Sequence, residues 1–288
     1  EGVKCDDCRH YEVVNTRILV IKLDAVGDVL RTTSILHGLK EKYPNSEIYW
    51  VTRSEAVPLF FNNTLVDNVL AYEHPETQFH LRVQHFDLVV NLDAAPAGAV
   101  LASMVAGAEK LGFGLNERGK VFPFNEEAVP WFEMGAFDDV KKRNTRTYQD
   151  IMLDICRLRT KKKEIMLNLS EGELAFASMF AQRHALRGNS IVIGMNTGAS
   201  PRWQYKQWTM EGYETLIRRV LSETTHTVLL YGGPHERERN ARLAELHPAR
   251  VIDTGTENTL RQFFSLITLS DVFLTGDTLA MHAAPALK

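Results

Sequence analysis

Cysteine is scarce in this chain, with three residues among 288. This number is too small for a disulfide framework in a chain of this length. Cys5 and Cys8 have the spacing of metal ligands in the stretch CDDCRHY, and His10 lies close by. No second C-x-x-C and no H-x-x-x-H follows to complete a tetrahedral site, which favours a structural role for this N-terminal lead. Cys5, Cys8 and His10 remain an alternative metal or redox site.

Long apolar runs and an excess of basic charge are also missing. No stretch reaches the roughly 18 apolar residues that span a bilayer, and the N-terminus lacks the pattern of a signal peptide, so we expect a cytoplasmic protein. The formal net charge of -3 and the pI near 6.4 argue against a general nucleic-acid-binding protein. The chain begins at Glu1 without a methionine and stops at Lys288 inside a predicted helix, so we expect both ends to be cut.

Alternating apolar segments predict an α/β fold. The opening series is a strand at 17–23, a helix at 27–44 and a strand at 47–53, which form a βαβ unit of a parallel sheet. A second series of alternating strands and helices runs through 190–276. We therefore predict two doubly wound, Rossmann-like domains in tandem: residues 1–168, with the CxxC lead at 5–8, and an incomplete domain at 169–288.

Three further patterns make specific predictions about local structure. A strand at 86–93 is followed by a small-residue helix at 94–108, and EKLGFG (109–114) predicts a short strand that runs into a glycine turn. The helix predicted at 173–186 carries an apolar stripe, formed by Leu174, Phe176, Ala177, Phe180 and Ala181.

The stretch KLDAVGDVLRTT places Asp28 where a strand turns into a helix. Gly27 is one glycine where a dinucleotide fingerprint would have three, so the sequence does not predict a Rossmann oxidoreductase. An acidic residue in a first helical turn has an ordinary structural explanation, because it accepts backbone N–H bonds and meets the positive end of the helix dipole. The same position lies beyond the carboxyl end of a strand, where ligands bind, and suits a general base.

Two later loops also follow predicted strands. NTGASPRWQYKQWT (196–209) carries Thr197, Ser200, Arg202 and Lys206, which are donors suited to phosphate oxygens, although a surface loop with packed tryptophans would read similarly. In TGDTLAMHAAPAL (275–287), the backbone N–H groups at the helix start form an anion site, from Gly276, Asp277 and Thr278. His282 lies one turn after Thr278, where it is either a structural residue or part of that site.

Two basic runs interrupt the chain, at 141–143 and 161–163. They are either solvated faces or surfaces that bind anions. If the second run meets phosphates on a lipid, replacing Lys161, Lys162 and Lys163 by glutamine should weaken binding to anionic vesicles.

Taken together, IKLDAVGDVLRTTSIL, NTGASPRWQYKQW and TGDTLAMHAAPAL resemble the heptosyltransferases of glycosyltransferase family 9. LGFG (111–114) also resembles a glycine turn of that family. The resemblance implies a GT-B fold, in which two Rossmann-like domains face a cleft. It further implies inverting transfer of a sugar from a nucleotide diphosphate donor, typically ADP-heptose, to a lipopolysaccharide precursor at the cytoplasmic face of the inner membrane.

The resemblance also assigns roles to residues. Asp28 matches the general base, Lys206 matches the lysine near the donor phosphates, and no metal cofactor is required. The N-terminal domain would then bind the acceptor and the C-terminal domain the nucleotide sugar. The expected donor-binding residues are Thr197, Ser200, Lys206, Gly276, Asp277, Thr278, Leu279 and His282.

Two other functions remain open from the sequence. One is a non-catalytic protein that binds a nucleotide sugar, and the other is a nucleotide-sugar epimerase on a GT-B scaffold. The chain departs from the family in its CxxC lead, and it stops at Lys288, where the family would continue with another strand and a helix.

Overall fold

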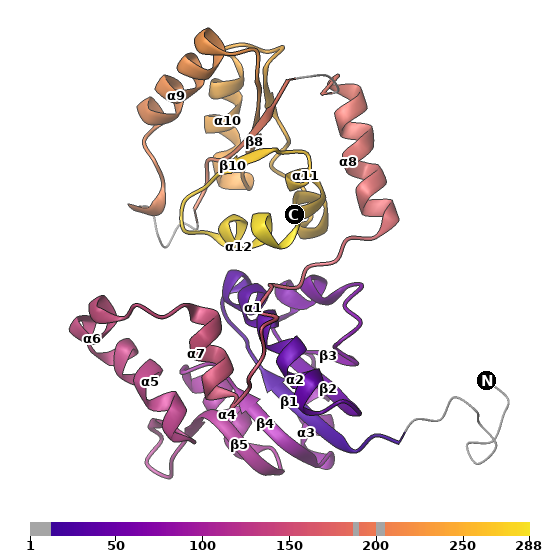
Figure 1. The fold of residues 1–288 in the computed structure, drawn as a ribbon, viewed down its shortest axis with the longest axis vertical. Coiled ribbons are helices and arrows are strands. Elements are labelled where there is room, and N and C mark those ends of the chain that lie inside the picture. Colours follow the sequence, from indigo (N-terminus) through magenta and orange to yellow (C-terminus); the bar gives the residue numbers. More distant parts are fainter. Residues whose placement is uncertain (1–12, 187–189, 200–204) are drawn as a thin grey trace, which may run out of the picture. The chain divides into compact units, whose positions relative to one another are not determined.

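The computed structural model describes residues 13–186, 190–199 and 205–288. The chain divides into two compact units, unit 1 (Glu1–Glu164) and unit 2 (Ile165–Lys288) (Figure 1). The sequence analysis had placed the domain boundary at 168/169. Each unit is an α/β layer structure built on its own mainly parallel sheet, as predicted from the alternating apolar segments.

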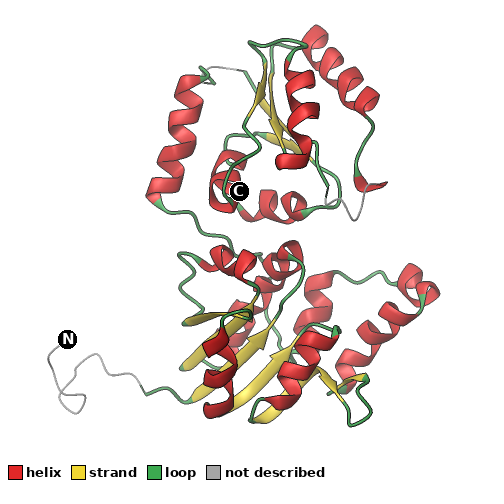
Figure 2. Cartoon of the chain, turned by 180° about the vertical axis from the view of Figure 1, so that it is seen from behind, coloured by secondary structure: helices red, strands yellow, loops and turns green. Residues whose placement is uncertain are grey.

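Unit 1 contains a six-stranded sheet in the order β3-β2-β1-β4-β5-β6. All neighbouring strands run parallel except β5 and β6. Because the central strand β1 is covered by helices on both faces (Figures 1 and 2), its residues 18–21 are fully buried and form one continuous apolar run. The strands are β1 (Thr16–Ile21), β2 (Ser46–Thr52), β3 (Asn68–Ala71), β4 (Phe86–Asn91), β5 (Gly107–Leu115) and β6 (Val121–Pro123).

The helices of unit 1 begin with α1, which a 3-10 turn joins to α2, so the single helix predicted at 27–44 is divided in two. The structure also contains β3, α3, α5, α6 and β6, which the sequence analysis did not predict. The helices are α1 (Val26–Thr32), α2 (Leu36–Lys42), α3 (Pro75–Val83), α4 (Pro96–Met104), α5 (Val129–Ala136), α6 (Asp138–Arg143) and α7 (Tyr148–Ile155), and the 3-10 turns are Thr33–Ile35, Ser54–Phe60 and Glu126–Ala128.

The LGFG stretch lies within β5, so the prediction of a glycine turn there is wrong. Gly112 has φ +87, and a Cβ at this position would lie 1.8 Å from the backbone oxygen of Asn91. A Cβ on Gly114 would lie 2.1 Å from the ring of Phe124. Both glycines are therefore required by close approach to neighbouring groups, and the chain turns later, between Asn116 and Lys120.

Unit 2 contains a four-stranded parallel sheet in the order β10-β7-β8-β9. Its core lies between the sheet and α9, where Met195, Tyr213, Ile217 and Leu230 pack together. The strands are β7 (Val192–Asn196), β8 (Thr227–Tyr231), β9 (Val251–Asp253) and β10 (Val272–Leu274); the helices are α8 (Glu171–Arg183), α9 (Met210–Glu223), α10 (Arg237–Ala244), α11 (Leu260–Ile267) and α12 (Leu279–Ala286), with a 3-10 turn at Pro234–Glu236.

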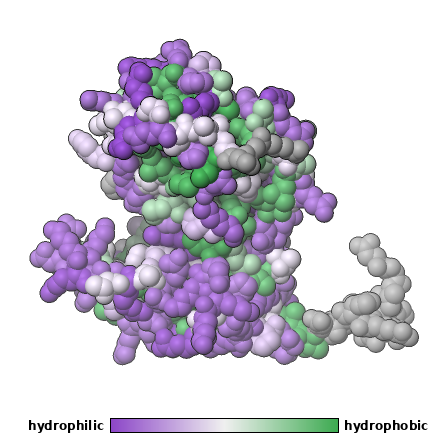
Figure 3. All heavy atoms as spheres, turned by 45° about the horizontal axis from the view of Figure 1, so that its top comes forward, coloured by the Kyte–Doolittle hydropathy of each residue, from purple (hydrophilic) through white to green (hydrophobic). Residues whose placement is uncertain are grey.

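The apolar stripe predicted on α8 is only partly buried. Ala177 is buried, Phe176 and Phe180 are half-buried, and Leu174 is 45% exposed. Figure 3 shows hydrophobic surface on the visible face of unit 2. The helix is held partly by polar contacts, because Arg261 of α11 pairs with Glu173 at 2.6 Å and also donates to the carbonyl of Asn168. Ser170 and Glu173 close a capping box at its start.

Replacing Glu173 with glutamine is expected to destabilise the protein by about 3 kcal/mol near neutral pH. Arg261, against the opposing effect of burial, lowers the pKa of Glu173 from 4.5 to about 2. A depressed carboxyl pKa stabilises the fold above the unfolded-state value, and this contribution is lost as pH falls from 4.5 towards 2. Urea unfolding at neutral and acidic pH measures both effects.

Glu171, two residues earlier and exposed, provides the matched control. Glu171→Gln should change the free energy of unfolding by less than about 0.5 kcal/mol. If Glu173→Gln behaved like Glu171→Gln at neutral pH, the Arg261 pair would not be the attachment of α8.

Candidate functional site

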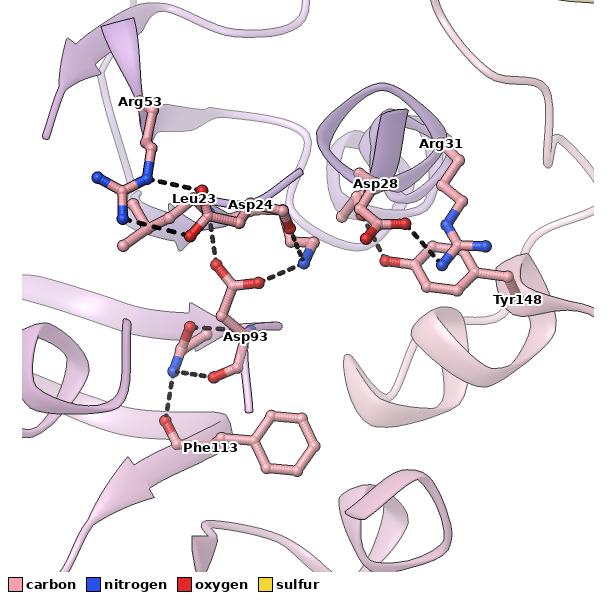
Figure 4. A network of polar contacts seen from close by, with 11 residues as sticks. Leu23, Asp24, Asp28, Arg31, Arg53, Asp93, Phe113 and Tyr148 are labelled. Carbon is pink, nitrogen blue, oxygen red and sulfur yellow. Dashed lines mark hydrogen bonds and ion pairs between the residues drawn. The ribbon is translucent and has the colours of Figure 1, made fainter. Parts of the chain in front are cut away.

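Asp28 lies in the first turn of α1, beyond the carboxyl end of β1, and its side chain is 39% exposed. Its carboxylate oxygen Oδ1 forms an ion pair with Arg31 Nη2 at 2.7 Å (Figure 4). The Arg31 guanidinium lies 3.7 Å from the ring centroid of Tyr148 in α7, and the Tyr148 hydroxyl is 2.6 Å from that of Thr32. Arg31 therefore holds an accessible carboxylate in place, which is compatible with a general base. The catalytic role itself stays a prediction.

A buried ion pair supports the loop that leads to Asp28. The side chains of Lys22 and Asp93 are each 7% exposed and contact one another. Asp93 also accepts the backbone N–H of Leu23 at 2.5 Å, and Lys22 donates to the carbonyl of Asp24 at 2.8 Å (Figure 4). These bonds tie the end of β1 to the end of β4.

The charge on Lys22 is maintained despite its burial. Burial lowers the pKa of Lys22, but the opposite charges of Asp93 and Asp28, with Tyr148 nearby, raise it above its ordinary value overall. Lys22 is therefore a cation at neutral pH, paired with the buried Asp93 carboxylate. The sequence analysis missed both members of the pair, because Lys22 simply ends an apolar strand pattern and Asp93 lies 71 residues away.

A second, more exposed network fixes the same loop from the side of β2. Arg53 pairs with Asp24 at 2.6 Å and with Glu73 at 3.0 Å. The pKa of Glu73 is lowered to about 2, because bonds from the Ser54 N–H and from Arg53 outweigh the effect of burial. The segments that follow β1, β2 and β3 are thus joined by carboxylate contacts near the position of Asp28.

In unit 2, the loops after β7 and β10 meet. The side-chain amide of Asn196 at the end of β7 donates to the hydroxyls of Thr275 and Thr278, both at 3.2 Å. A Cβ on Gly276 would lie 2.6 Å from the backbone oxygen of Lys206, so only glycine allows this approach. The structure therefore brings together two of the predicted loops, which are far apart in the sequence.

Lys206 and Asp277 form an exposed ion pair at this junction. Their charged atoms lie 2.5 Å apart, and the side chains are 37% and 60% exposed, respectively. Leu279 begins α12 and His282 lies one turn after Thr278, half-buried. The ammonium of Lys206 is accessible beside the first turn of α12, an arrangement that suits an anionic ligand.

Thr197 differs from its prediction. It is fully buried, and its hydroxyl donates to Asn240 at 2.6 Å, so it does not present a donor to a ligand in this structure. Ser200 lies outside the described residues, as do Arg202, Cys5, Cys8 and His10.

The sequence analysis also missed residues of α10 and of the turn before it. Arg239 donates to the carbonyl of Thr197 at 2.5 Å and to Gln207 at 3.0 Å, which braces the loop after β7. Glu236 is a buried carboxylate beside Gly198, where an added Cβ would lie 2.5 Å from the carboxyl carbon. The stretch GGPHERERN directly follows β8, and this position was the available signal.

Within the described ranges, 13–186, 190–199 and 205–288, no helix has both the length and the apolar character to cross a bilayer. Within the same ranges, no group of three or more His, Cys, Asp or Glu side chains could hold a metal ion.

A family model and a relative with similar sequence both point to the heptosyltransferases. The sequence model of Glycosyltransferase family 9 (heptosyltransferase) matches residues 78–288. The lipopolysaccharide core heptosyltransferase OpsX of Haemophilus influenzae is 21% identical over 280 residues, covering 93% of this chain and 75% of OpsX.

Solved structures show the same fold. A family 9 glycosyltransferase from Veillonella parvula has a TM-score of 0.76 at 19% identity, covering 96% of this chain and 80% of that chain. The heptosyltransferase WaaC of E. coli, solved with ADP, has a TM-score of 0.62 at 20% identity, covering 94% of this chain and 84% of that chain. The predicted fold class, two Rossmann-like sheets similar to those of GT-B heptosyltransferases, is confirmed.

Proposed function

This chain belongs to glycosyltransferase family 9, and we propose that it transfers a heptose, with inversion, from ADP-heptose to a lipopolysaccharide core or lipid A precursor. The observation that carries the proposal is the accessible Asp28 carboxylate, oriented by Arg31 beyond the end of β1. The donor assignment is supported by WaaC, which was solved with ADP, and the acceptor class by OpsX, which is named for the lipopolysaccharide core. We place the reaction in the cytoplasm, at the inner membrane.

In the proposed reaction, unit 1 binds the acceptor and unit 2 the donor. Asp28 takes the proton from an acceptor hydroxyl while the oxygen of that hydroxyl bonds to the anomeric carbon of the heptose. The bond between the anomeric carbon and the diphosphate breaks in the same step. The departing ADP gains negative charge on its terminal phosphate. Lys206 and the backbone N–H groups at Gly276, Asp277 and Thr278 would stabilise that charge, so the proposal calls on no cofactor beyond the donor.

ADP is expected to raise the melting temperature of the protein more than UDP, GDP or dTDP do, because a ligand that binds only the folded state stabilises it. In Lys206→Ala the affinity for ADP should fall about tenfold or more, since a charged phosphate contact is lost and Asp277 loses its counter-ion. Thermal unfolding over a range of nucleotide concentrations measures both effects.

Lys288→Ala is the matched control, because Lys288 is an exposed lysine of the same unit. Its ADP-induced shift should equal that of the wild type. Equal shifts with all four nucleotides would contradict the adenine assignment, and unchanged ADP affinity in Lys206→Ala would remove Lys206 from the donor site.

A further inference from the structure

Helix α5 of the α5–α6 hairpin, residues 129–143, is unusually apolar for a surface element, whereas α6 is mostly charged. Neither helix contains a buried residue, although α5 carries Val129, Trp131, Phe132 and Met134. Val129 is 37% exposed, and Phe137, which joins the two helices, is 60% exposed. An apolar helix is ordinarily covered by another part of the protein or by a partner.

One side of this hairpin is attached to unit 1. The ring centroid of Trp131 lies 5.4 Å from that of Tyr148 in α7, and that of Phe132 lies 6.2 Å from that of Phe113 in β5. Figure 1 shows that the α5–α6 connection projects away from the sheet of unit 1. The exposed Phe137 therefore lies at a projecting turn of an otherwise anchored element.

Basic side chains follow this turn directly. Lys141, Lys142 and Arg143 form the last turn of α6, and all three are exposed. Among the residues that the structure describes, none of them takes part in an ion pair, and Figure 3 shows a hydrophilic surface at this projection. The acids Asp138 and Asp139 lie in the preceding turn.

The second basic run is different, because acids of unit 1 already neutralise much of it. Lys163 pairs with Asp150, and Lys162 lies 3.8 Å from Glu41. The sequence analysis had predicted lipid binding for the run at 161–163. The structure favours the run at 141–143 instead, because two lysines of the second run have acidic partners, whereas no residue of the first run has one among the described residues.

An apolar groove lies beside the hairpin, between α5, α6 and α7. It has a volume of about 210 Å³, and its lining residues are Pro130, Met134, Val140 and Ile151 with Glu127, Arg143, Asn144 and Arg146. Arg146 pairs with Asp154 and Glu127 pairs with Arg157, so Arg143 is the charged lining residue that has no ion pair among the described residues. Apolar walls next to the Arg143 guanidinium complement a lipid, in which acyl carbon lies next to a phosphate.

The hairpin is connected to Asp28 through three successive contacts within unit 1. Asp28 pairs with Arg31 at 2.7 Å, Arg31 lies 3.7 Å from the Tyr148 ring, and that ring contacts Trp131 of α5. Only Arg31 and Tyr148 therefore separate Asp28 from the hairpin along this series of contacts, so a lipid-linked acceptor whose hydroxyl reached Asp28 would lie near the hairpin.

We propose that the α5–α6 hairpin docks unit 1 on an anionic phospholipid surface. Phe137 enters the boundary between headgroups and acyl chains, while Lys141, Lys142 and Arg143 contact lipid phosphates. The purpose of this docking, access to a lipid-linked acceptor, rests on the function proposed above. The binding itself does not, so the two can fail separately.

Co-sedimentation with phosphatidylcholine vesicles, with and without phosphatidylglycerol, tests the proposal. We expect the wild type to bind the anionic vesicles, and to bind them less as salt increases. The triple variant Lys141→Gln, Lys142→Gln, Arg143→Gln should bind them about tenfold more weakly or worse, because each basic residue near such a surface contributes. Phe137→Ser should weaken binding to both vesicle types. Because no residue of the hairpin is buried, thermal unfolding should show that both variants stay folded.

The matched control replaces the three cations of the other run, in Lys161→Gln, Lys162→Gln, Lys163→Gln. It should bind anionic vesicles as the wild type does. Equal losses in the two triple variants would overturn the proposal, as would a wild type that binds neither vesicle. If Phe137→Ser instead abolished self-association in solution, the surface would be an interface between copies and the proposal would be wrong. Turnover of a delipidated, soluble acceptor should be unchanged in the hairpin variants, whereas failure of the proposed function would abolish it in the wild type as well.

Discussion

Replacing Asp28 with asparagine is expected to lower turnover by roughly 10²–10⁴-fold, which is the usual contribution of a positioned general base. Asparagine has nearly the same shape but cannot take the proton of an attacking hydroxyl at neutral pH. Affinity for ADP should stay unchanged, because Asp28 lies in unit 1 while Lys206 and the start of α12 lie in unit 2. Product formation at saturating donor and ADP-induced thermal stabilisation measure the two quantities separately.

Asp28→Glu is the informative companion variant. It keeps a carboxylate but moves it by one methylene relative to Arg31, so turnover should fall between those of the wild type and Asp28→Asn. A non-catalytic binder would show no turnover in any of the three proteins. If Asp28→Asn kept turnover within about tenfold of the wild type, the acidic residue would have only the structural role of a first-turn carboxylate.

Replacing Asp93 with asparagine is expected to lower the free energy of unfolding by about 3–5 kcal/mol. The change leaves Lys22 charged and buried without a counter-ion, while an amide oxygen can still accept the N–H of Leu23. Because the pKa of Lys22 is raised in the folded state, its stabilising contribution is present at neutral pH and is lost only at alkaline pH, above 10.5. Urea unfolding near neutral pH measures the loss.

The double variant Lys22→Met, Asp93→Asn shows whether the stability lost in Asp93→Asn comes from the unpaired, buried charge of Lys22 or from another effect of the substitution. It removes both charges, so most of the stability lost in Asp93→Asn should return. Arg219→Gln breaks the exposed pair with Glu223 and should change the free energy of unfolding by less than about 0.5 kcal/mol. A loss below about 1 kcal/mol in Asp93→Asn would show that the buried pair does not hold the loop before Asp28.

The fold was predictable where burial imposes a period on the sequence. β1 and β7 are interior parallel strands that read as continuous apolar runs, and α9 (Met210–Glu223) lies within the alternating series predicted at 190–276. α5 and α6 were missed because neither buries a residue, so no period marks them. The stripe on α8 was predicted from the helical spacing of its apolar residues, but it is only partly buried, and the ion pair of Glu173 with Arg261 adds a polar attachment that the spacing does not show.

The candidate site was predictable only where one short segment carries the signal. Asp28 and Gly276 follow strands within recognisable stretches, and the structure places both beyond strand ends. Lys22 and Asp93 could not be paired from the sequence, because their contact depends on β1 and β4 being neighbours in the sheet. The donor-binding role of Thr197 stays a prediction, and its burial and the bond of its hydroxyl to Asn240 could not be foreseen from its residue type.

The most direct test of the proposed function is the acceptor dependence of ADP release from ADP-heptose. With a lipopolysaccharide core precursor present, we predict that the wild type releases ADP and adds one heptose to the acceptor, and that Asp28→Asn does neither at a comparable rate. Without acceptor, we predict no consumption of the donor. Conversion of the donor in the absence of acceptor would instead indicate an epimerase, and no heptose transfer to the precursor by the folded, ADP-binding wild type would contradict the proposed reaction.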